Sequence, residues 1–129
     1  MSQLSQSMKT TFAVISPDQN VSLEENNSTI YPRLNANYND FKGHQLVAWH
    51  EFSEDWESWE MHPAGDEILV VVRGEITLLL QTEDGEQQTT LSQEGDYAVI
   101  PKGIWHTALV DSLVKVLFIT PGEGTQHKN

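Results

Sequence analysis

The chain has 129 residues, with 19 acidic and 7 basic side chains and a formal net charge of −12 at neutral pH. The length favours one domain with a real core, and the negative charge argues against nucleic-acid or anionic-membrane partners. No cysteine is present, no apolar run could span a bilayer, and residues 1–10 lack a signal-peptide core, so we expect a cytoplasmic protein without disulfides.

Short runs rich in Val, Ile, Leu, Thr and aromatic residues recur along the chain, and turn residues end each of them. They predict strands over residues 11–16, 44–52, 57–62, 67–72, 75–81, 87–92, 97–100, 106–110 and 113–120. The Asp-Gly pair at 84–85 is typical of a hairpin turn, which needs positive φ.

Two segments show no strand pattern of this kind. The Asn-rich region 17–40 is interpreted as a loop with one short strand around Thr29–Tyr31, and residues 122–129 as a mobile terminus. No long segment has the 3.6-residue apolar period of a helix, so we expect no major helix.

Many short antiparallel strands in a small chain predict an all-β sandwich or barrel. Ile68–Val72 and Leu78–Leu80 are apolar at consecutive positions, which is typical of strands covered on both faces. One face would line the barrel interior, and the other would meet a second sheet or a partner subunit. We expect an N-terminal arm over residues 1–40, a barrel over 41–121 and a flexible tail over 122–129.

Three potential metal ligands fall close together in the sequence WEMHPAGDE. Glu60 and His62 are two apart on a predicted strand, so their side chains share a face. The PAGD segment predicts a turn, after which Glu67 begins the next strand and can face the same space. Converging donors from different segments are what a metal site needs. The alternative is ordinary surface charge beside a core strand.

A second segment, GDYAVIPKGIWH, favours the metal site over ordinary surface charge. Together the two segments resemble the motifs of the cupin family. The first motif ends in His, three or four residues, Glu, six residues, Gly; the second is Gly, five residues, Pro-x-Gly, two residues, His. The matching residues here are His62, Glu67, Gly74, Gly95, Pro101, Gly103 and His106.

Three positions depart from the family pattern. Glu54 replaces the opening glycine of the first motif, Glu60 replaces its first histidine, and Val110 replaces the final asparagine of the second motif. The change at Glu60 matters most, because it alters the set of metal ligands.

The resemblance implies an antiparallel double-stranded β-helix, or jelly-roll barrel, with one divalent metal ion inside. Carried over, the ligands are Glu60, His62, Glu67 and His106. Two imidazoles with two carboxylates favour Mn or Fe(II), allow Zn or Ni and make Cu less suitable. Glu60 is either a fourth ligand or a general base beside a two-histidine, one-carboxylate site. The alternative is a barrel that has lost its metal. No organic cofactor is predicted.

Four further residues are candidates for contact with a substrate. Ser58 shares strand parity with Glu60, and Val110 shares parity with His106, so both could line the pocket. His50 could support the site or contact substrate, although a core or surface histidine is the alternative. Trp105 could lie at the cavity rim, although aromatic residues more often fill cores and interfaces.

Three functions remain open. The first is a metal-dependent enzyme acting on a small organic molecule as a dioxygenase, isomerase or decarboxylase. The second is a non-catalytic protein that binds or senses a small acid or sugar, with or without metal. The third is a structural module. The fold does not choose among these. The apolar strands and the habit of the family both favour a homodimer.

Overall fold

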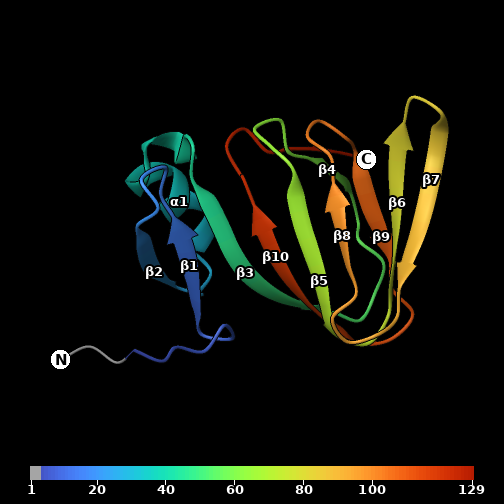
Figure 1. Ribbon diagram of the computed structural model, residues 1–129, viewed down its shortest axis with the longest axis horizontal. Coiled ribbons are helices and arrows are strands. Elements are labelled where there is room, and N and C mark those ends of the chain that lie inside the picture. The colour runs from blue at the N-terminus through green and yellow to red at the C-terminus, as the bar shows by residue number, and fades with distance from the viewer. Residues whose placement is uncertain (1–3) are drawn as a thin grey trace.

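The computed structural model describes residues 4–129 and consists of antiparallel strands in two sheets (Figure 1). The six-stranded sheet has the order β2 (Val21–Glu25), β1 (Thr11–Ile15), β3 (Gln45–Phe52), β10 (Val114–Thr120), β5 (Glu67–Arg73), β8 (Tyr97–Ile100). The five-stranded sheet has the order β11 (Gln126–Lys128), β4 (Trp59–Met61), β9 (His106–Leu109), β6 (Ile76–Thr82), β7 (Gly85–Leu91). The predicted antiparallel jelly-roll architecture is confirmed.

The interpretation of the N-terminal region is wrong in its details. Residues expected to form a loop contain β2, and the short strand expected around Thr29–Tyr31 is replaced by helix α1 (Ile30–Asn37) and a 3₁₀ turn, η1 (Asn39–Phe41). The helix buries only Ile30 and Leu34, one turn apart, so it is too short to show a sustained helical period. No helix in residues 4–129 has the length and apolarity needed to cross a membrane.

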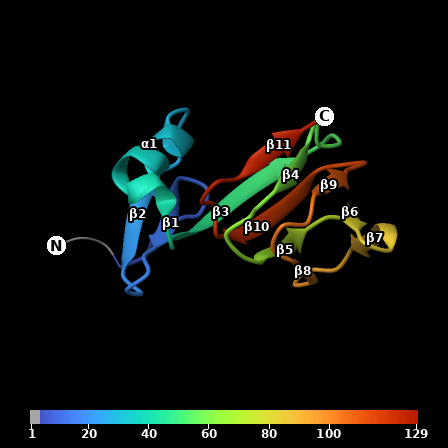
Figure 2. The same cartoon turned by 90° about the horizontal axis from the view of Figure 1, so that it is seen from above.

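The C-terminal segment also differs from the expectation of a mobile terminus. Residues Gln126–Lys128 form β11, which pairs with β4 at the edge of the five-stranded sheet. Figures 1 and 2 show β1, β2 and α1 at one end of the molecule and the β6–β7 hairpin at the other. The division into arm, barrel and tail stays a prediction.

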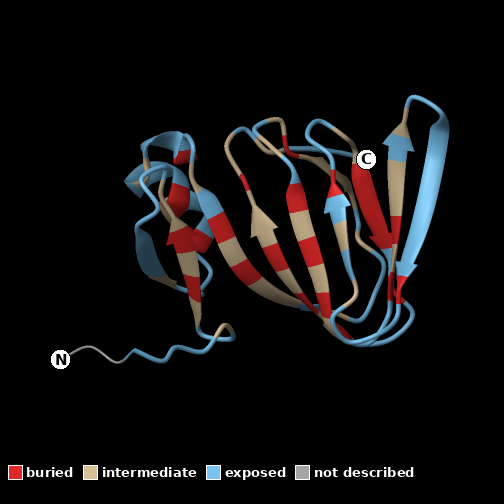
Figure 3. Ribbon diagram, in the orientation of Figure 1, coloured by how far each residue is buried: buried red, intermediate tan, exposed pale blue. Residues whose placement is uncertain are grey.

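The core lies between the two sheets, and strand alternation selects the residues that enter it. On β5, Glu67, Leu69 and Val71 are buried, whereas Ile68 and Val70 on the opposite face are half-buried. Figure 3 shows this alternation along β3, β5 and β10. Most buried side chains are apolar, so the burial of Glu67, His62 and His106 is exceptional and marks the site described below.

Gly74 shows why the first motif needs a glycine after β5. Its φ is +97°, and a Cβ atom there would lie 2.6 Å from the Leu113 carbonyl oxygen and 2.9 Å from Val114 Cα. A side chain at this turn would therefore collide with backbone at the start of β10. The glycine permits the close approach that brings β5 and β10 together.

Candidate metal centre

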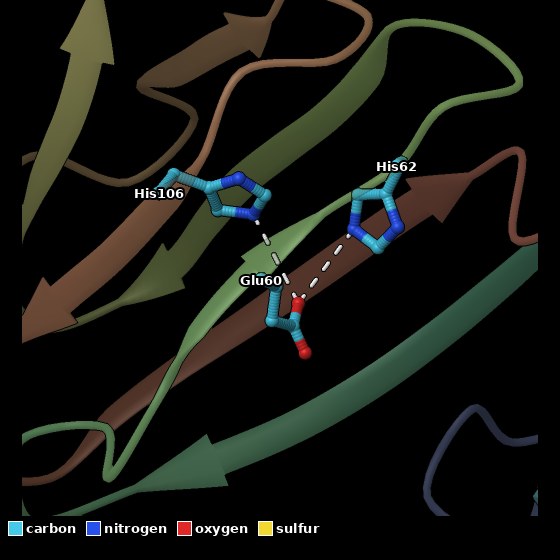
Figure 4. Close-up of side chains that lie close together, drawn as sticks. All are labelled: Glu60, His62 and His106. Carbon is cyan, nitrogen blue, oxygen red and sulfur yellow. Dashed lines mark ion pairs between the residues drawn. The ribbon is translucent and has the colours of Figure 1, made fainter. Parts of the chain in front are cut away.

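Four side chains from three strand segments converge at one end of the barrel interior. Glu60 lies on β4 and His62 follows that strand, while Glu67 begins β5 and His106 begins β9. Glu60 and His106 are directly opposite each other in the β4–β9 pair, so their side chains share a face. The His62 carbonyl accepts a hydrogen bond from Gly103 N–H at 3.1 Å, which links the two motif segments. Figure 4 shows Glu60 between the two imidazoles.

The distances between donor atoms suit one metal ion. Glu67 places one carboxylate oxygen 3.2 Å from His62 Nε2 and the other 3.2 Å from His106 Nε2. Glu60 Oε1 lies 3.6 Å from His62 Nε2 and 3.9 Å from His106 Nε2. Two ligands each about 2.1 Å from one ion are about 3.0 Å apart at a right angle and about 3.4 Å apart at a tetrahedral angle.

The protein holds both imidazoles with Nε2 facing this common point. His106 Nδ1 lies 3.1 Å from the Ile104 carbonyl oxygen, which can only accept a hydrogen bond, so Nδ1 carries the proton. His62 Nδ1 lies 2.8 Å from Thr125 Oγ1, and that hydroxyl already donates to the Gly122 carbonyl oxygen at 2.9 Å. His62 Nδ1 must therefore also be the donor. Each neutral ring then presents an Nε2 lone pair, as metal ligands do.

Three of the candidate ligand atoms have no hydrogen-bond partner among residues 4–129. They are His62 Nε2, His106 Nε2 and Glu67 Oε1, which are buried, although oppositely charged groups lie 3.2 Å away. Glu67 is 2% exposed and His106 is fully buried. Unsatisfied buried polar groups are costly, and a divalent cation at the common point would satisfy all three. Glu60, His62 and His106 also have ligand atoms within 4.8 Å of one another. The residues present therefore fit a metal ion.

The pKa values of His62, Glu67 and Glu60 are shifted by their neighbours in the metal-free protein. Burial by itself would lower the pKa of His62, but the Glu60 and Glu67 carboxylates beside it raise that pKa to about 9. Burial would raise the pKa of Glu67, but His106 and His62 outweigh it and lower the pKa to about 2. Burial and the Glu67 charge would raise the pKa of Glu60, but His62 and His106 together outweigh them and lower it. The site thus keeps its carboxylates ionised, as metal binding requires.

The chain as a whole matches a known family. The family model for the cupin domain covers residues 49–120, more than half of the chain. The chain belongs to the cupin family. No curated protein matches the sequence.

Solved structures show the same cupin architecture in other proteins. Protein NMB1881 from Neisseria meningitidis has a TM-score of 0.50 at 24% identity, over 59% of this chain and 72% of that chain. Hydroquinone 1,2-dioxygenase from Sphingomonas sp. TTNP3 has a TM-score of 0.51 at 14% identity, over 59% and 58%. An oxalate oxidase has a TM-score of 0.52 at 19% identity, over 63% and 44%. The present cupin thus corresponds to about half the length of the two enzymes, and these likenesses show the fold.

A cavity of about 850 Å³ opens beside the four candidate ligands and contains Glu60, His62 and Glu67 in its wall. Ser58 and His50 line it, in the places that the sequence analysis expected. The structure does not place Trp105 or Val110 along this wall. Trp105 immediately precedes β9, and Lys128 Nζ lies over its ring, 4.6 Å from the ring centroid. Val110 is buried, and its N–H donates to Asp55 Oδ1 at 2.7 Å.

The sequence analysis missed residues at the site that come from outside the motifs. Tyr31 on α1 reaches the cavity, and its hydroxyl lies 2.7 Å from His50 Nε2. Burial, with the negative charges of Glu60 and Glu67, raises the pKa of Tyr31 to about 12. Thr120 donates a hydrogen bond of 2.6 Å to Glu67 Oε2. Its even spacing from the inward-facing Phe118 was a usable signal, whereas nothing in the local sequence placed Tyr31.

Proposed function

We propose that this cupin binds one divalent metal ion through Glu60, His62, Glu67 and His106 and acts on a small organic molecule in the adjoining cavity. The observation that carries the proposal is the convergence of three buried ligand atoms that have no hydrogen-bond partner in the described part of the chain, with Glu60 beside them. Oxidation by O₂ is the reaction class we favour. It suits a site with two imidazoles and carboxylates, and a dioxygenase and an oxidase share the fold.

The ligand set favours Mn or Fe(II) over Cu, with Zn or Ni as possible alternatives, because two of its four donors are carboxylates. When bound, the ion supplies a Lewis acid and, if it is Fe or Mn, a redox centre. The protein groups orient this centre. Ile104 and Thr125 fix the two imidazoles, and Thr120 fixes one oxygen of Glu67.

The cavity wall indicates what kind of molecule would fit. Phe52, Trp56 and Phe118 give it an aromatic side, and its described lining residues include no lysine or arginine. Trp56 lines the same space, and its buried Nε1–H has no hydrogen-bond partner in the described chain. We infer a substrate with an apolar body and an oxygen that can accept from Trp56. An organic acid or a sugar-like molecule would bind with its oxygens on the metal, because no cationic side chain replaces the metal charge.

Tyr31 and His50 add polar groups to the cavity next to the aromatic wall, because the His50 ring centroid lies 6.1 Å from that of Phe52 and 5.7 Å from that of Phe118. Burial lowers the pKa of His50 below its usual value although Glu60 opposes this shift, so the ring is neutral at neutral pH. A neutral imidazole that is hydrogen-bonded to a phenol hydroxyl can transfer a proton to or from a bound molecule. We propose this pair as the acid–base group of the site and Ser58 as a further substrate contact.

Metal reconstitution tests the proposal. Wild-type protein should take up one equivalent of Mn²⁺, Fe²⁺ or Zn²⁺, and His106→Ala should lose stoichiometric binding, because no neighbouring side chain can supply the missing donor. His44→Ala is the matched control, since His44 packs on Tyr38 and Phe41 away from these ligands. Equal, sub-stoichiometric metal in wild type and His106→Ala would refute the site. Stoichiometric Fe(II) binding without O₂ consumption across small-molecule libraries would favour the non-catalytic binding function.

We also propose that two copies associate through the outer face of the six-stranded sheet. The strand registers place apolar side chains side by side across all six strands: Val21, Leu23, Ala13, Ile15, Val47, Trp49, Leu117, Ile119, Ile68, Val70, Val99 and Tyr97. Val99 and Tyr97 are 50% and 64% exposed at one edge of this face. An apolar face continuous over a whole sheet is typical of an interaction surface.

Light scattering at tens of micromolar protein tests this association. Wild type should have the mass of a dimer, and Val99→Lys should shift it towards the monomer, because a charge would be buried without a partner. Leu109→Lys is the control, since Leu109 has similar exposure but lies on β9 of the other sheet. A monomeric wild type would contradict the proposed dimer.

A further inference from the structure

The C-terminal segment 122–128 lies outside the part of the chain that matches the cupin family model, yet it contacts the candidate metal centre. It consists of a turn over residues 122–125 and strand β11. Two of its side chains, Thr125 and His127, each touch a different candidate ligand. Both also line the cavity.

Thr125 contacts His62 at Nδ1, the ring nitrogen that does not face the candidate metal position. Its hydroxyl donates to the Gly122 carbonyl oxygen, so it can only accept from His62 Nδ1. This arrangement keeps the proton on Nδ1, so that Nε2 is the nitrogen available to a metal ion when the ring is neutral, and it fixes the ring orientation. Residues 62 and 125 are far apart in sequence, so the contact depends on the fold of the C-terminal turn.

His127 contacts Glu60, a second candidate ligand, at the carboxylate oxygen that does not face the candidate metal position. The two residues are directly opposite in the β11–β4 pair, so their side chains lie on one face. His127 Nε2 lies 3.2 Å from Glu60 Oε2, whereas Oε1 of the same carboxylate faces His62 and His106. Glu60 thus has one oxygen directed to the candidate metal position and the other held by β11.

Contacts outside the site anchor the strand that carries these residues. Lys128 Nζ donates to Gln81 Oε1 at 2.8 Å and lies over the Trp105 ring. These contacts join β11 to β6 and to the residue before β9. Neither contact involves a candidate ligand. A substitution of Lys128 therefore tests the anchoring of β11 separately from the contacts of Thr125 and His127 with the ligands.

We propose that segment 122–128 is a working part of the metal centre, with Thr125 and His127 as positioning residues for His62 and Glu60. The inference rests on the proposed metal function and adds to it a dependence on residues outside the family motifs. The unusual glutamate at position 60 then has a structural counterpart, because an imidazole from β11 holds its second oxygen. Groups that orient metal ligands typically change affinity about 10- to 100-fold when removed.

Metal affinity of the full-length chain, measured by competition with a chromophoric chelator using Mn²⁺ and Ni²⁺, tests this. Thr125→Val should weaken binding about 10- to 100-fold, and Thr125→Ser should restore most of it, because serine keeps the hydroxyl. His127→Ala should weaken binding by a smaller factor, because its hydrogen bond to Glu60 is exposed, and His127→Gln should recover part of the loss. Lys128→Ala is the matched control and should bind as wild type. Thermal unfolding of the metal-free variants checks that each one folds.

The outcomes separate this inference from the proposed function. A wild type that binds metal with unchanged affinity in Thr125→Val and His127→Ala overturns the inference and leaves the metal site standing. An equal loss in Lys128→Ala also overturns it, because the segment would then act only by stabilising β11. A wild type that binds no metal overturns both.

Discussion

The raised pKa of His62 predicts a steep pH dependence of metal binding. Because that pKa is about 9 in the metal-free protein, His62 carries a proton on Nε2 at neutral pH, and a metal ion must displace it. Affinity should therefore fall as pH falls below 9, approaching about tenfold per pH unit and amounting to about 50-fold between pH 9 and pH 7. Near pH 7.5, binding should release about one proton.

Competition titrations with Ni²⁺ from pH 6.5 to 9.5 measure the slope, and calorimetry in buffers of different ionisation enthalpy counts the protons. Metal-free stability should move in the opposite direction. A raised pKa stabilises the fold fully below the ordinary value of 6.5, and this contribution is lost as pH rises through about 9. Glu60→Gln should shift the rise in affinity to lower pH, because it removes one carboxylate that raises the pKa, whereas the exposed Glu54→Gln should not. Affinity that is flat between pH 7 and pH 9, with no proton released, would refute this reasoning.

Three further predictions test other parts of the structure. Glu60→His should fold, keep a metal and shift preference towards Ni or Zn, whereas Glu60→Gln should weaken binding; an unchanged metal order and affinity in both would mean that Glu60 is not a ligand. Gly74→Ala should destabilise the protein by more than about 1 kcal/mol, and by more than Gly85→Ala. Both glycines have φ near +100°, but an added Cβ meets backbone only at position 74, so equal unfolding free energies in denaturant would contradict the clash. In an NMR titration, His50 should be half-protonated only below pH 6.5, because burial lowers its pKa; a midpoint above 6.5 would argue against its role as a neutral partner of Tyr31.

The sequence by itself determined most of the strands and the four candidate metal ligands, although it missed β2 and β11. Runs rich in Val, Ile, Leu, Thr and aromatic residues, ended by turn residues, predicted β3, β5 and β10, because strand preference is largely a local property of the sequence. The two-residue spacing placed Glu60 and His62 on one side, and the motif spacing brought in Glu67 and His106. In the structure, Glu60 and Glu67 each place a carboxylate oxygen within 3.9 Å of both imidazole Nε2 atoms.

Only the tertiary structure decided what surrounds these ligands. The contacts of Thr125 with His62 and of His127 with Glu60 each join residues more than 60 positions apart, and Tyr31 reaches His50 from a helix too short to show a period. Such contacts depend on which strands pair at the sheet edge and where the N-terminal helix packs. Local pattern fixes the face to which a side chain points, but the partner on that face is set by the pairing of distant segments, which no local spacing records.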